Sequence, residues 1–529
     1  MAKSSAQGSK PNASPEPTAL QAALDAHGIA LSSDEAASVA SLANWLSSGI
    51  AKLADVQPAA PSQAGLDAST APDLTIFEAG RRLRDGRLTS VALTRAHLRR
   101  IVDHNATLKA FYSVLEERAI EDARRADAEL AAGQDRGPLH GIPIAIKDLI
   151  DVAGLPTTAG STSRKNAIAE ANAEVVQRLV DGGAIILGKL ATYEWGTVGP
   201  AFDILYPPAT NPWNLDYITG GSSSGCASAV AGRLVRSSIG SDTGGSLRSP
   251  AAYCGAVGLK PTYGAVPKTG AIGLAPSMDH LGPMSATVAD AALTLDVIAR
   301  RSGPDSAASR LGETIAGLRI GYARNWFAQD PQAMPVIVMA MDAAISQLSL
   351  LGAMVEQIEL PDYELFEAAG AAILHAEAFK LHASALRDTP DAYGRQSFQT
   401  LAAGIALTDA EYQASLRAGA ALRTQLDAVL DRVDAVVTAC TLTTALPVSA
   451  FGRSSVWTPM RTIGFNVTGH PVLALPIGLS DVGLPMGMQI VGKHFDEALI
   501  CQLGDAYEQV AGTADLVAPH AAGPTTNTA

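Results

Sequence analysis

The sequence predicts an α/β protein in which helices cover a central β-sheet. Short apolar runs typical of buried strands alternate with longer segments typical of helices, and this alternation is the usual sign of a layered α/β architecture. The composition agrees, because 47% of the 529 residues are hydrophobic and only 17% are charged, against ~25% charged residues in an average soluble domain. A chain of this length can bury one large core or several smaller ones.

The N-terminal segment is expected to lie outside the main body. Residues 1–16 are rich in Ser, Pro, Ala and Lys, a composition that predicts disorder. Residues 17–72 are expected to form a small helical extension and a linker, since Ser32–Glu35 is a capping-box pattern that precedes apolar residues at helical spacing. The pattern then predicts one large domain over 73–515 and a flexible tail over 516–529.

Within the large domain, helices and strands are expected in turn. The predicted helices are amphipathic or rich in small residues and cover 89–103, 115–132, 225–232 and most of 361–430. The predicted strands are short and apolar and cover 141–146, 184–187, 435–437, 472–476 and 486–491. No internal repeat of about 20–50 residues is present, which argues against a repeat architecture.

Charge, cysteines and hydropathy exclude several classes of protein. With 39 Lys+Arg against 52 Asp+Glu, the net charge of −13 predicts no basic surface, so we expect no nucleic-acid partner. The four cysteines form no Cys-x-x-Cys pair and the ten histidines no His-Glu-x-x-His motif, so we expect neither a disulfide framework nor a metal site. The chain has no apolar run near the ~18–20 residues of a membrane span and no secretory signal. We therefore expect a cytoplasmic protein with no membrane partner.

Two motifs match known sites only in part. Gly183–Leu190 nearly matches a phosphate-binding P-loop, but Leu190 stands where Ser or Thr would hold Mg²⁺. Gly221–Gly225 matches Gly-x-Ser-x-Gly, the nucleophile elbow of α/β-hydrolases, with Ser223 as the nucleophile. That elbow needs a buried strand before it, and residues 214–219 form a poor one. An esterase that uses Ser223 stays open as an alternative.

Three separated motifs carry residues that could do chemistry. Lys147 ends the apolar run Gly141–Ile146; burial would lower its pKa and make it a base near neutral pH, whereas a surface lysine would extend into solvent. The glycines and serines of Gly220–Gly225 allow unusual backbone geometry. In Gly240–Pro250, two glycines precede Ser246, and consecutive N–H groups there could form either an anion-binding nest or a simple tight turn.

Taken together, these motifs resemble those of the amidase signature family of Ser–Ser–Lys hydrolases. The spacing agrees, with 75 positions from Lys147 to Ser222 and 24 from Ser222 to Ser246. The resemblance covers about residues 74 to 512 and includes three further segments, Gly258–Gly264, Phe465–Pro471 and Gly483–Gln489. It implies the amidase-signature fold, a large mixed β-sheet covered by helices on both faces (α/β/α), with the small helical N-terminal extension added.

The resemblance also implies a catalytic triad. Ser246 would be the nucleophile, Lys147 the base, and Ser222 the bridging serine between them. A serine hydroxyl is a weak nucleophile until an adjacent base takes its proton, so such a relay makes chemical sense. The family places a cis peptide bond before the bridging serine, which predicts one at Gly221–Ser222.

Further residues around the triad follow from the same resemblance. The oxyanion hole would be formed by backbone N–H groups of Thr243, Gly244, Gly245 and Ser246. The residues expected to orient the serine loop are Ser223 and Asp242. The substrate-binding candidates are Trp195, Gly196, Thr197 and Arg248. Trp195 could instead belong to the core, and Arg248 could instead form a structural ion pair.

The leading functional hypothesis is a hydrolase that cleaves the C–N bond of a small amide other than a peptide bond, with extension to esters, anilides or carbamates. We expect no cofactor, a small-molecule substrate and a homodimer. One alternative is the amidase subunit of a tRNA-dependent amidotransferase, and another is a catalytically silent binding protein on the same fold. Fold alone does not decide between these hypotheses.

Overall fold

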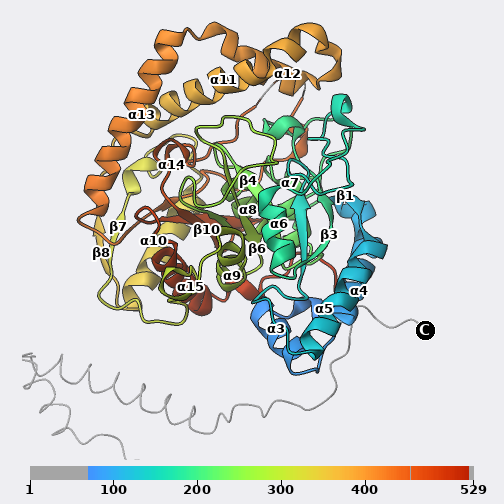
Figure 1. Cartoon of the computed structure of the whole chain (residues 1–529). Coiled ribbons are helices and arrows are strands. Elements are labelled where there is room, and N and C mark those ends of the chain that lie inside the picture. Colours follow the sequence, from blue (N-terminus) through green and yellow to red (C-terminus); the bar gives the residue numbers. More distant parts are fainter. Residues whose placement is uncertain (1–69, 453, 455, 524–529) are drawn as a thin grey trace, which may run out of the picture. The chain divides into compact units, whose positions relative to one another are not determined.

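Within residues 70–523, apart from 453 and 455, the computed structural model contains one mixed β-sheet of eleven strands (Figure 1). The strands are β1 Phe111–Val114, β2 Pro143–Lys147, β3 Ile185–Leu190, β4 Ser237–Asp242, β5 Val257–Lys260, β6 His280–Ser285, β7 Arg319–Tyr322, β8 Met354–Gln357, β9 Ala435–Ala439, β10 Val472–Leu479 and β11 Pro485–Val491. Their order across the sheet is β1-β3-β2-β4-β6-β5-β10-β11-β9-β7-β8.

The sheet is parallel in two places and antiparallel elsewhere. β2 pairs in parallel with β3 and β4, and β7 pairs in parallel with β8 and β9. The remaining neighbours are antiparallel. Because Ile146 of β2 lies opposite Ile239 of β4, the ends of these two strands meet at the same edge of the sheet. Lys147 and Asp242 are therefore carried to that edge together.

Helices cover both faces of the sheet. The helices are α3 Ile76–Arg84, α4 Ser90–Leu108, α5 Glu116–Ala131, α6 Glu174–Asp181, α7 Ser224–Ala231, α8 Arg248–Cys254, α9 Val288–Ala299, α10 Pro335–Leu350, α11 Tyr363–Asp388, α12 Arg395–Ala402, α13 Asp409–Leu430, α14 Gly464–Thr468 and α15 Glu497–Ala511. Successive strand side chains point to opposite faces. In β2, accordingly, Ile144 and Ile146 enter a core with α6, α9, α10 and α15, whereas Ala145 enters one with α4, α5, α7 and α8.

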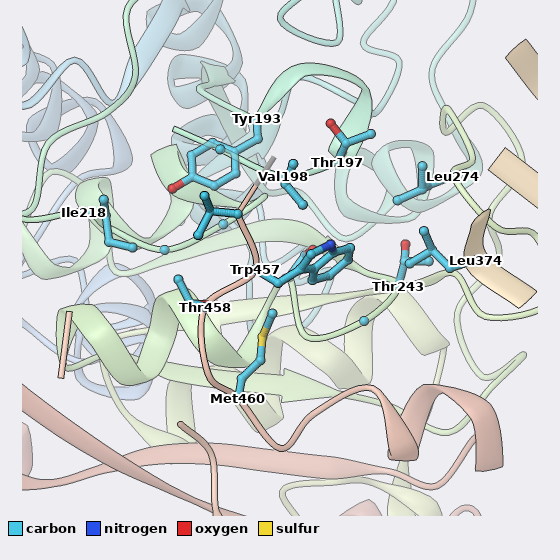
Figure 2. A pocket seen from close by; sticks show the side chains of 17 residues that line it. Tyr193, Thr197, Val198, Ile218, Thr243, Leu274, Leu374, Trp457, Thr458 and Met460 are labelled. Carbon is cyan, nitrogen blue, oxygen red and sulfur yellow. The ribbon is translucent and has the colours of Figure 1, made fainter. Parts of the chain in front are cut away.

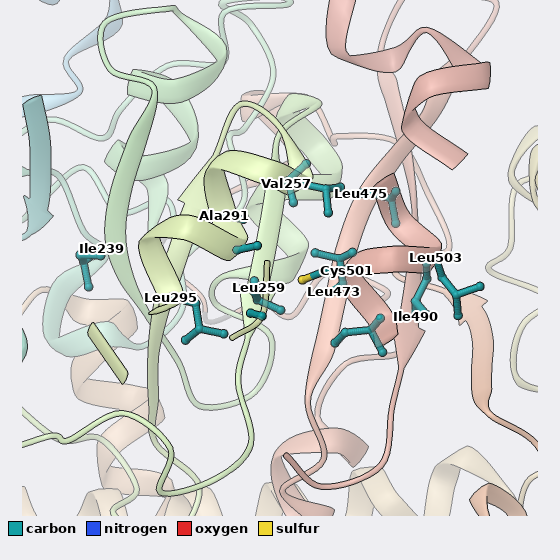
Figure 3. Close-up of a cluster of buried hydrophobic side chains, with 14 of the residues drawn as sticks. Ile239, Val257, Leu259, Ala291, Leu295, Leu473, Leu475, Ile490, Cys501 and Leu503 are labelled. Carbon is teal, nitrogen blue, oxygen red and sulfur yellow. The ribbon is translucent and has the colours of Figure 1, made fainter. Parts of the chain in front are cut away.

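The first of these cores is the largest. Figure 3 shows a part of it in which Leu295 of α9 and Leu259 of β5 lie near Leu473 of β10 and Cys501 of α15. A third core joins α11, α12, α13 and α14, the helices drawn mainly in orange and red in Figure 1. The expected α/β class, with a mixed sheet covered on both faces, is confirmed.

The predicted elements are present, and the structure adds strands that the sequence did not predict. The predicted helices at 89–103, 115–132 and 225–232 correspond to α4, α5 and α7, and the helical stretch 361–430 resolves into α11, α12 and α13. Among the unpredicted strands are β4 and β6, two central strands that contain Gly together with Asp or Pro. These residue types are depleted in strands, so their extended form depends on pairing with neighbours.

The predictions for the two ends of the chain can be compared with the structure only at the C-terminal end. The expectations for residues 1–16 and for the extension up to residue 69 lie outside the described residues. At the other end, we expected a flexible tail from residue 516, but residues 516–523 pack against the domain. Ala522 is buried and its N–H donates to the Gly232 carbonyl at 3.0 Å, while Ala518 packs beside Trp213. None of the described helices is long and apolar enough to cross a membrane.

Candidate active site

Lys147 lies fully buried at the end of β2, where its Nζ contacts three serine hydroxyls. The distances are 2.8 Å to Ser222 Oγ, 2.9 Å to Ser223 Oγ and 2.8 Å to Ser241 Oγ. Burial lowers the pKa of Lys147 to about 7, because removing an ammonium from water disfavours its charged form. A large fraction of this lysine is therefore neutral near pH 7.

Nζ can donate to all three hydroxyls as an ammonium, and a neutral amine, which has two N–H donors and one lone pair, can also satisfy the three contacts. Ser223 Oγ donates its own proton to the Ser241 carbonyl at 3.1 Å, so it accepts from Lys147. If Ser241 accepts the second N–H, the lone pair is left to accept the Ser222 hydroxyl proton. The arrangement can therefore draw a proton from Ser222 toward Lys147.

Ser222 and Ser223 lie just before α7 and are both buried. The Gly221–Ser222 peptide bond is cis, as expected. Gly221 leaves no room for a side chain, because a Cβ there would lie 2.2 Å from Cε2 of Tyr193. The elbow alternative fits poorly, since no strand precedes Ser223 between residues 214 and 219 and its hydroxyl is committed to Lys147 and Ser241.

Ser246 is the triad candidate that faces open space. It lies in the turn between β4 and α8, is only partly buried, and lines a cavity of about 490 Å³. Its carbonyl accepts from the Ser223 N–H at 3.2 Å, which ties the two serine loops together. Figure 2 shows the mixed lining of the cavity, in which Trp457 and Met460 approach from one segment and Tyr193 and Val198 from another.

The backbone beside Ser246 only partly matches the expected oxyanion hole. Thr243 and Gly244 line the cavity, and the Gly244 carbonyl accepts from Thr462 Oγ1 at 2.6 Å. Gly245 differs, because its N–H donates to Asp242 Oδ1 at 2.8 Å. Assigning Gly245 as an oxyanion donor is therefore not supported by this geometry, since the N–H already has a buried carboxylate partner.

Asp242 and Arg248 form a fully buried ion pair behind the loop. Arg248 Nε donates to Asp242 Oδ2 at 3.0 Å, and the guanidinium also donates to the Thr462 carbonyl and to Asn466 Oδ1. Burial alone would raise the pKa of Asp242, but Arg248 and the Asn466 amide hold it well below its usual range. Arg248 does not line the cavity, so the geometry does not support it as a substrate-binding residue. It forms a structural ion pair, which was the alternative considered for it from the sequence.

Of the three substrate-binding candidates that follow β3, two line the cavity and one does not. Gly196 and Thr197 line the cavity with Ser246. Trp195 does not line it: its ring is almost buried and packs against His382 and Tyr393, at centroid distances of 4.7 and 5.8 Å. Trp195 is therefore a core residue, which was the alternative to substrate binding considered for it from the sequence.

The sequence analysis missed several residues of the site. Ser241 precedes Asp242 in the Gly-Ser-Asp-Thr-Gly-Gly-Ser run, so its contact with Lys147 could have been suspected from strand alternation. No pattern pointed to Val456, Trp457 and Met460, which a segment more than 200 residues after Ser246 brings to the cavity.

One cluster of metal-ligand residue types occurs among the described residues. It comprises Asp427, His470 and His494, and His470 Nε2 lies 2.9 Å from Asp427 Oδ1. The two imidazole rings are tilted by 35° to one another at a centroid distance of 4.0 Å. We assign no metal to this cluster.

Comparison with known proteins decides the family. A family model described as Amidase matches residues 92–501, most of the chain. This chain belongs to the amidase signature family. It is 36% identical to a glutamyl-tRNA(Gln) amidotransferase subunit of Chloroflexus aggregans over 473 residues, which cover 83% of this chain and 96% of that relative. Membership shows an amidase-type enzyme acting on C–N bonds.

Solved structures of amidase-family relatives agree in fold. One, from work on a vestigial protein complex and the evolutionary origins of an s-triazine catabolic enzyme, superposes with a TM-score of 0.76 at 31% identity, covering 83% of this chain and 98% of that one. The peptide amidase of Stenotrophomonas maltophilia gives a TM-score of 0.73 at 29% identity, with 86% and 99% covered.

The amidase-family relatives correct one expectation, that there is no nucleic-acid partner. That exclusion rested on the net charge of −13, yet relatives matched over nearly their whole length are named as a subunit of a glutamyl-tRNA(Gln) amidotransferase. Net charge averages over the whole surface, and one subunit of an assembly need not itself carry the basic surface that holds RNA. An acidic amidase-family chain is therefore compatible with a tRNA-linked reaction.

Proposed function

We propose that this chain cleaves the C–N bond of an amide through an acyl-enzyme on Ser246, with Lys147 as the base and Ser222 as the proton relay. The observation that supports this most is the buried lysine. Its pKa is lowered to about 7 and its Nζ touches Ser222, while Ser246 lies on the wall of the adjacent cavity. Perturbed pKa values in a cleft beside a potential nucleophile are typical of catalytic sites.

The proposed steps conserve atoms and protons. Ser246 Oγ attacks the amide carbon while its proton passes to Ser222, whose own proton passes to neutral Lys147. Backbone N–H groups of Thr243, Gly244 and Ser246 stabilise the oxyanion. The C–N bond breaks as the leaving nitrogen takes a proton back through Ser222. Water then attacks the ester, regenerates Ser246 and releases the acid.

The setting that sequence similarity supports best is one subunit of an amidotransferase. The relatives matched over 96% of their length are named as glutamyl-tRNA(Gln) amidotransferase subunits. In that setting the ammonia set free by the acyl-enzyme reaction would be passed to a tRNA-linked acceptor in the assembled enzyme. The chemistry at Ser246 is the same as in a hydrolase; what differs is the fate of the nitrogen.

A stand-alone amidase is the second candidate, and the lining of the cavity favours it. Among the described lining residues none is Asp, Glu, Lys, Arg or His, and Leu274, Leu374 and Val456 supply apolar surface. A free amino-acid amide carries an ammonium and a carboxylate, and burying them without partners costs several kcal/mol. This lining suits a neutral amide better.

Covalent labelling tests the proposed nucleophile. Wild-type protein should be labelled at a single serine by a fluorophosphonate, which traps activated serines as stable adducts. Ser246→Ala should lose labelling by at least about 1,000-fold, because the attacking atom is gone. Ser223→Ala is the matched control and should keep part of the reaction. Labelling that persists in Ser246→Ala but is lost in Ser223→Ala would reverse the assignment.

Substrate profiling separates the two settings. The chain alone would be assayed for ammonia release from glutamine, asparagine and neutral aliphatic and aryl amides, with Ser246→Ala as the blank. Co-expression with candidate partner subunits, followed by the same assays, tests the assembly. Turnover of amino-acid amides only in a complex supports the amidotransferase setting, whereas efficient turnover of neutral amides by the chain alone supports the stand-alone enzyme.

A further inference from the structure

A partly buried carboxylate that the proposed mechanism does not use connects two walls of the active site. Asp279 lies just before β6 and is partly buried. Its Oδ1 accepts from Thr243 Oγ1 at 2.6 Å and from the Ala275 N–H at 3.1 Å, and its Oδ2 accepts from the Leu274 N–H at 3.0 Å. Thr243 and Leu274 both line the cavity that holds Ser246.

Thr243 separates that cavity from a second one. The second cavity measures about 330 Å³ and is lined by Thr243 and Leu274 together with Ser241, Asp279, Lys268 and His280. A side chain between two cavities has less packing to hold it than one in a solid core. The hydrogen bond to Asp279 therefore supplies a restraint on Thr243 that packing does not.

The restraint matters because of what Thr243 would do. An oxyanion hole works only when its N–H groups are held at the place where charge develops. On the far side, Thr462 Oγ1 holds the Gly244 carbonyl at 2.6 Å. Asp279 and Thr462 therefore clamp neighbouring residues of the same segment from two directions, one through a side chain and one through the backbone.

Asp279 also acts on Lys147 through its charge. The charged or titratable groups that act on Lys147 are Cys226, Asp242 and Asp279, and each opposes the effect of burial by favouring the ammonium form. Asp242 is neutralised by Arg248 at 3.0 Å. The hydrogen-bond partners of Asp279 are a hydroxyl and two backbone N–H groups, and the titratable groups around its cavity are Lys268 and His280.

We infer that Asp279 is a positioning residue for acyl transfer, which holds the Thr243 segment of the oxyanion hole. The inference rests on the proposed acyl-enzyme function. Asp279 itself touches neither the nucleophile nor the base. It would act through Thr243, so its loss should slow acylation without removing any reacting atom.

The test is the rate of fluorophosphonate labelling of the full-length chain as a function of pH, which needs no known substrate. Thr243→Val keeps the backbone N–H and removes only the hydroxyl link, and Asp279→Asn keeps an acceptor oxygen and removes the charge. We expect labelling about tenfold slower for each, because a loosened oxyanion donor costs less than a deleted one. The double variant should be no slower than the slower single variant, since the two residues share one link.

The pH profile distinguishes positioning from mere structural support. Labelling should rise with pH as Lys147 loses its proton, and the Asp279 carboxylate raises the pKa of that lysine. Asp279→Asn should therefore move the rising limb to lower pH. Asp296→Asn is the matched control: Asp296 is a carboxylate that likewise accepts from a hydroxyl and two backbone N–H groups, but it lies on α9 and outside both cavities.

The outcomes are distinct. If wild-type protein is not labelled at all, the proposed acyl-enzyme function fails. If wild-type and Ser246→Ala behave as proposed but Thr243→Val and Asp279→Asn keep the wild-type rate and pH limb, the role of Asp279 is overturned. Equal slowing in Asp296→Asn would also overturn it, because the effect would then be a general loss of stability. If Asp279→Asn does not fold, the labelling rate of Thr243→Val alone tests the link: slower labelling supports it, and the wild-type rate overturns it.

Discussion

At the scale of single residues, burial decides the chemistry. Lys147 is identical in covalent structure to any surface lysine, but full burial lowers its pKa to about 7, and the contact with Ser222 gives its lone pair a partner. Gly221 shows the same dependence on surroundings, because only the Tyr193 ring beside it makes a side chain impossible there. The chemistry of these residues is a property of their environment.

The pH dependence of acylation follows from Lys147. The neutral amine is the base, so the rate should fall about tenfold per pH unit below pH 7 and level off above it. Lys147→Arg checks the cause, because a guanidinium stays protonated at every accessible pH and should leave no rising limb. A wild-type profile that is flat between pH 5 and 8 would contradict Lys147 as the base.

At the scale of elements, the turn between β4 and α8 depends on one buried ion pair. Asp242 accepts from the N–H groups of Gly245 and Leu247, which shapes the turn that presents Ser246, and Arg248 neutralises that carboxylate. Removing one member of a buried pair leaves an uncompensated charge. Arg248 and the Ser246 turn are therefore coupled in stability.

Arg248→Met should destabilise the fold strongly. The expected loss is about 3–5 kcal/mol, because Asp242 is left buried and unpaired. Denaturant unfolding followed by tryptophan fluorescence measures it. Arg300→Met is the control, since the Arg300–Asp181 pair is largely exposed and such pairs contribute little. Adding Asp242→Asn to Arg248→Met should recover part of the loss; equal effects of the Arg248 and Arg300 variants would contradict the buried-pair account.

At the scale of the whole molecule, the sheet brings together segments that are distant in sequence. β2 carries Lys147 and β4 leads to Ser246, while Trp457 and Met460 come from the segment that precedes α14. The C-terminal residues contribute to this body as well, since Ala518 and Ala522 are buried against it. The last described residues, 516–523, are thus part of the packed domain.

Truncation checks the role of the C-terminal residues. A chain that ends at Asp515 loses the buried Ala518 and Ala522 and the hydrogen bonds from the His520 and Ala522 N–H groups, so its melting temperature should fall by several degrees. A chain that ends at Gly523 keeps these contacts and serves as the control. Equal melting temperatures for the two truncated chains would show that residues 516–523 add nothing to stability.

The sequence by itself determined the α/β class, the family resemblance and the three residues Lys147, Ser222 and Ser246, because glycine-rich turns and a lysine after an apolar run are local patterns. Only the tertiary structure decided which neighbours surround them. In the structure, Arg248 and Trp195 do not line the cavity, and the Gly245 N–H donates to Asp242. The structure also shows that Ser241 contacts Lys147, that Asp279 accepts from Thr243, and that Trp457 lines the cavity. These assignments depend on strand pairing and burial between residues far apart in the chain, which no local pattern specifies.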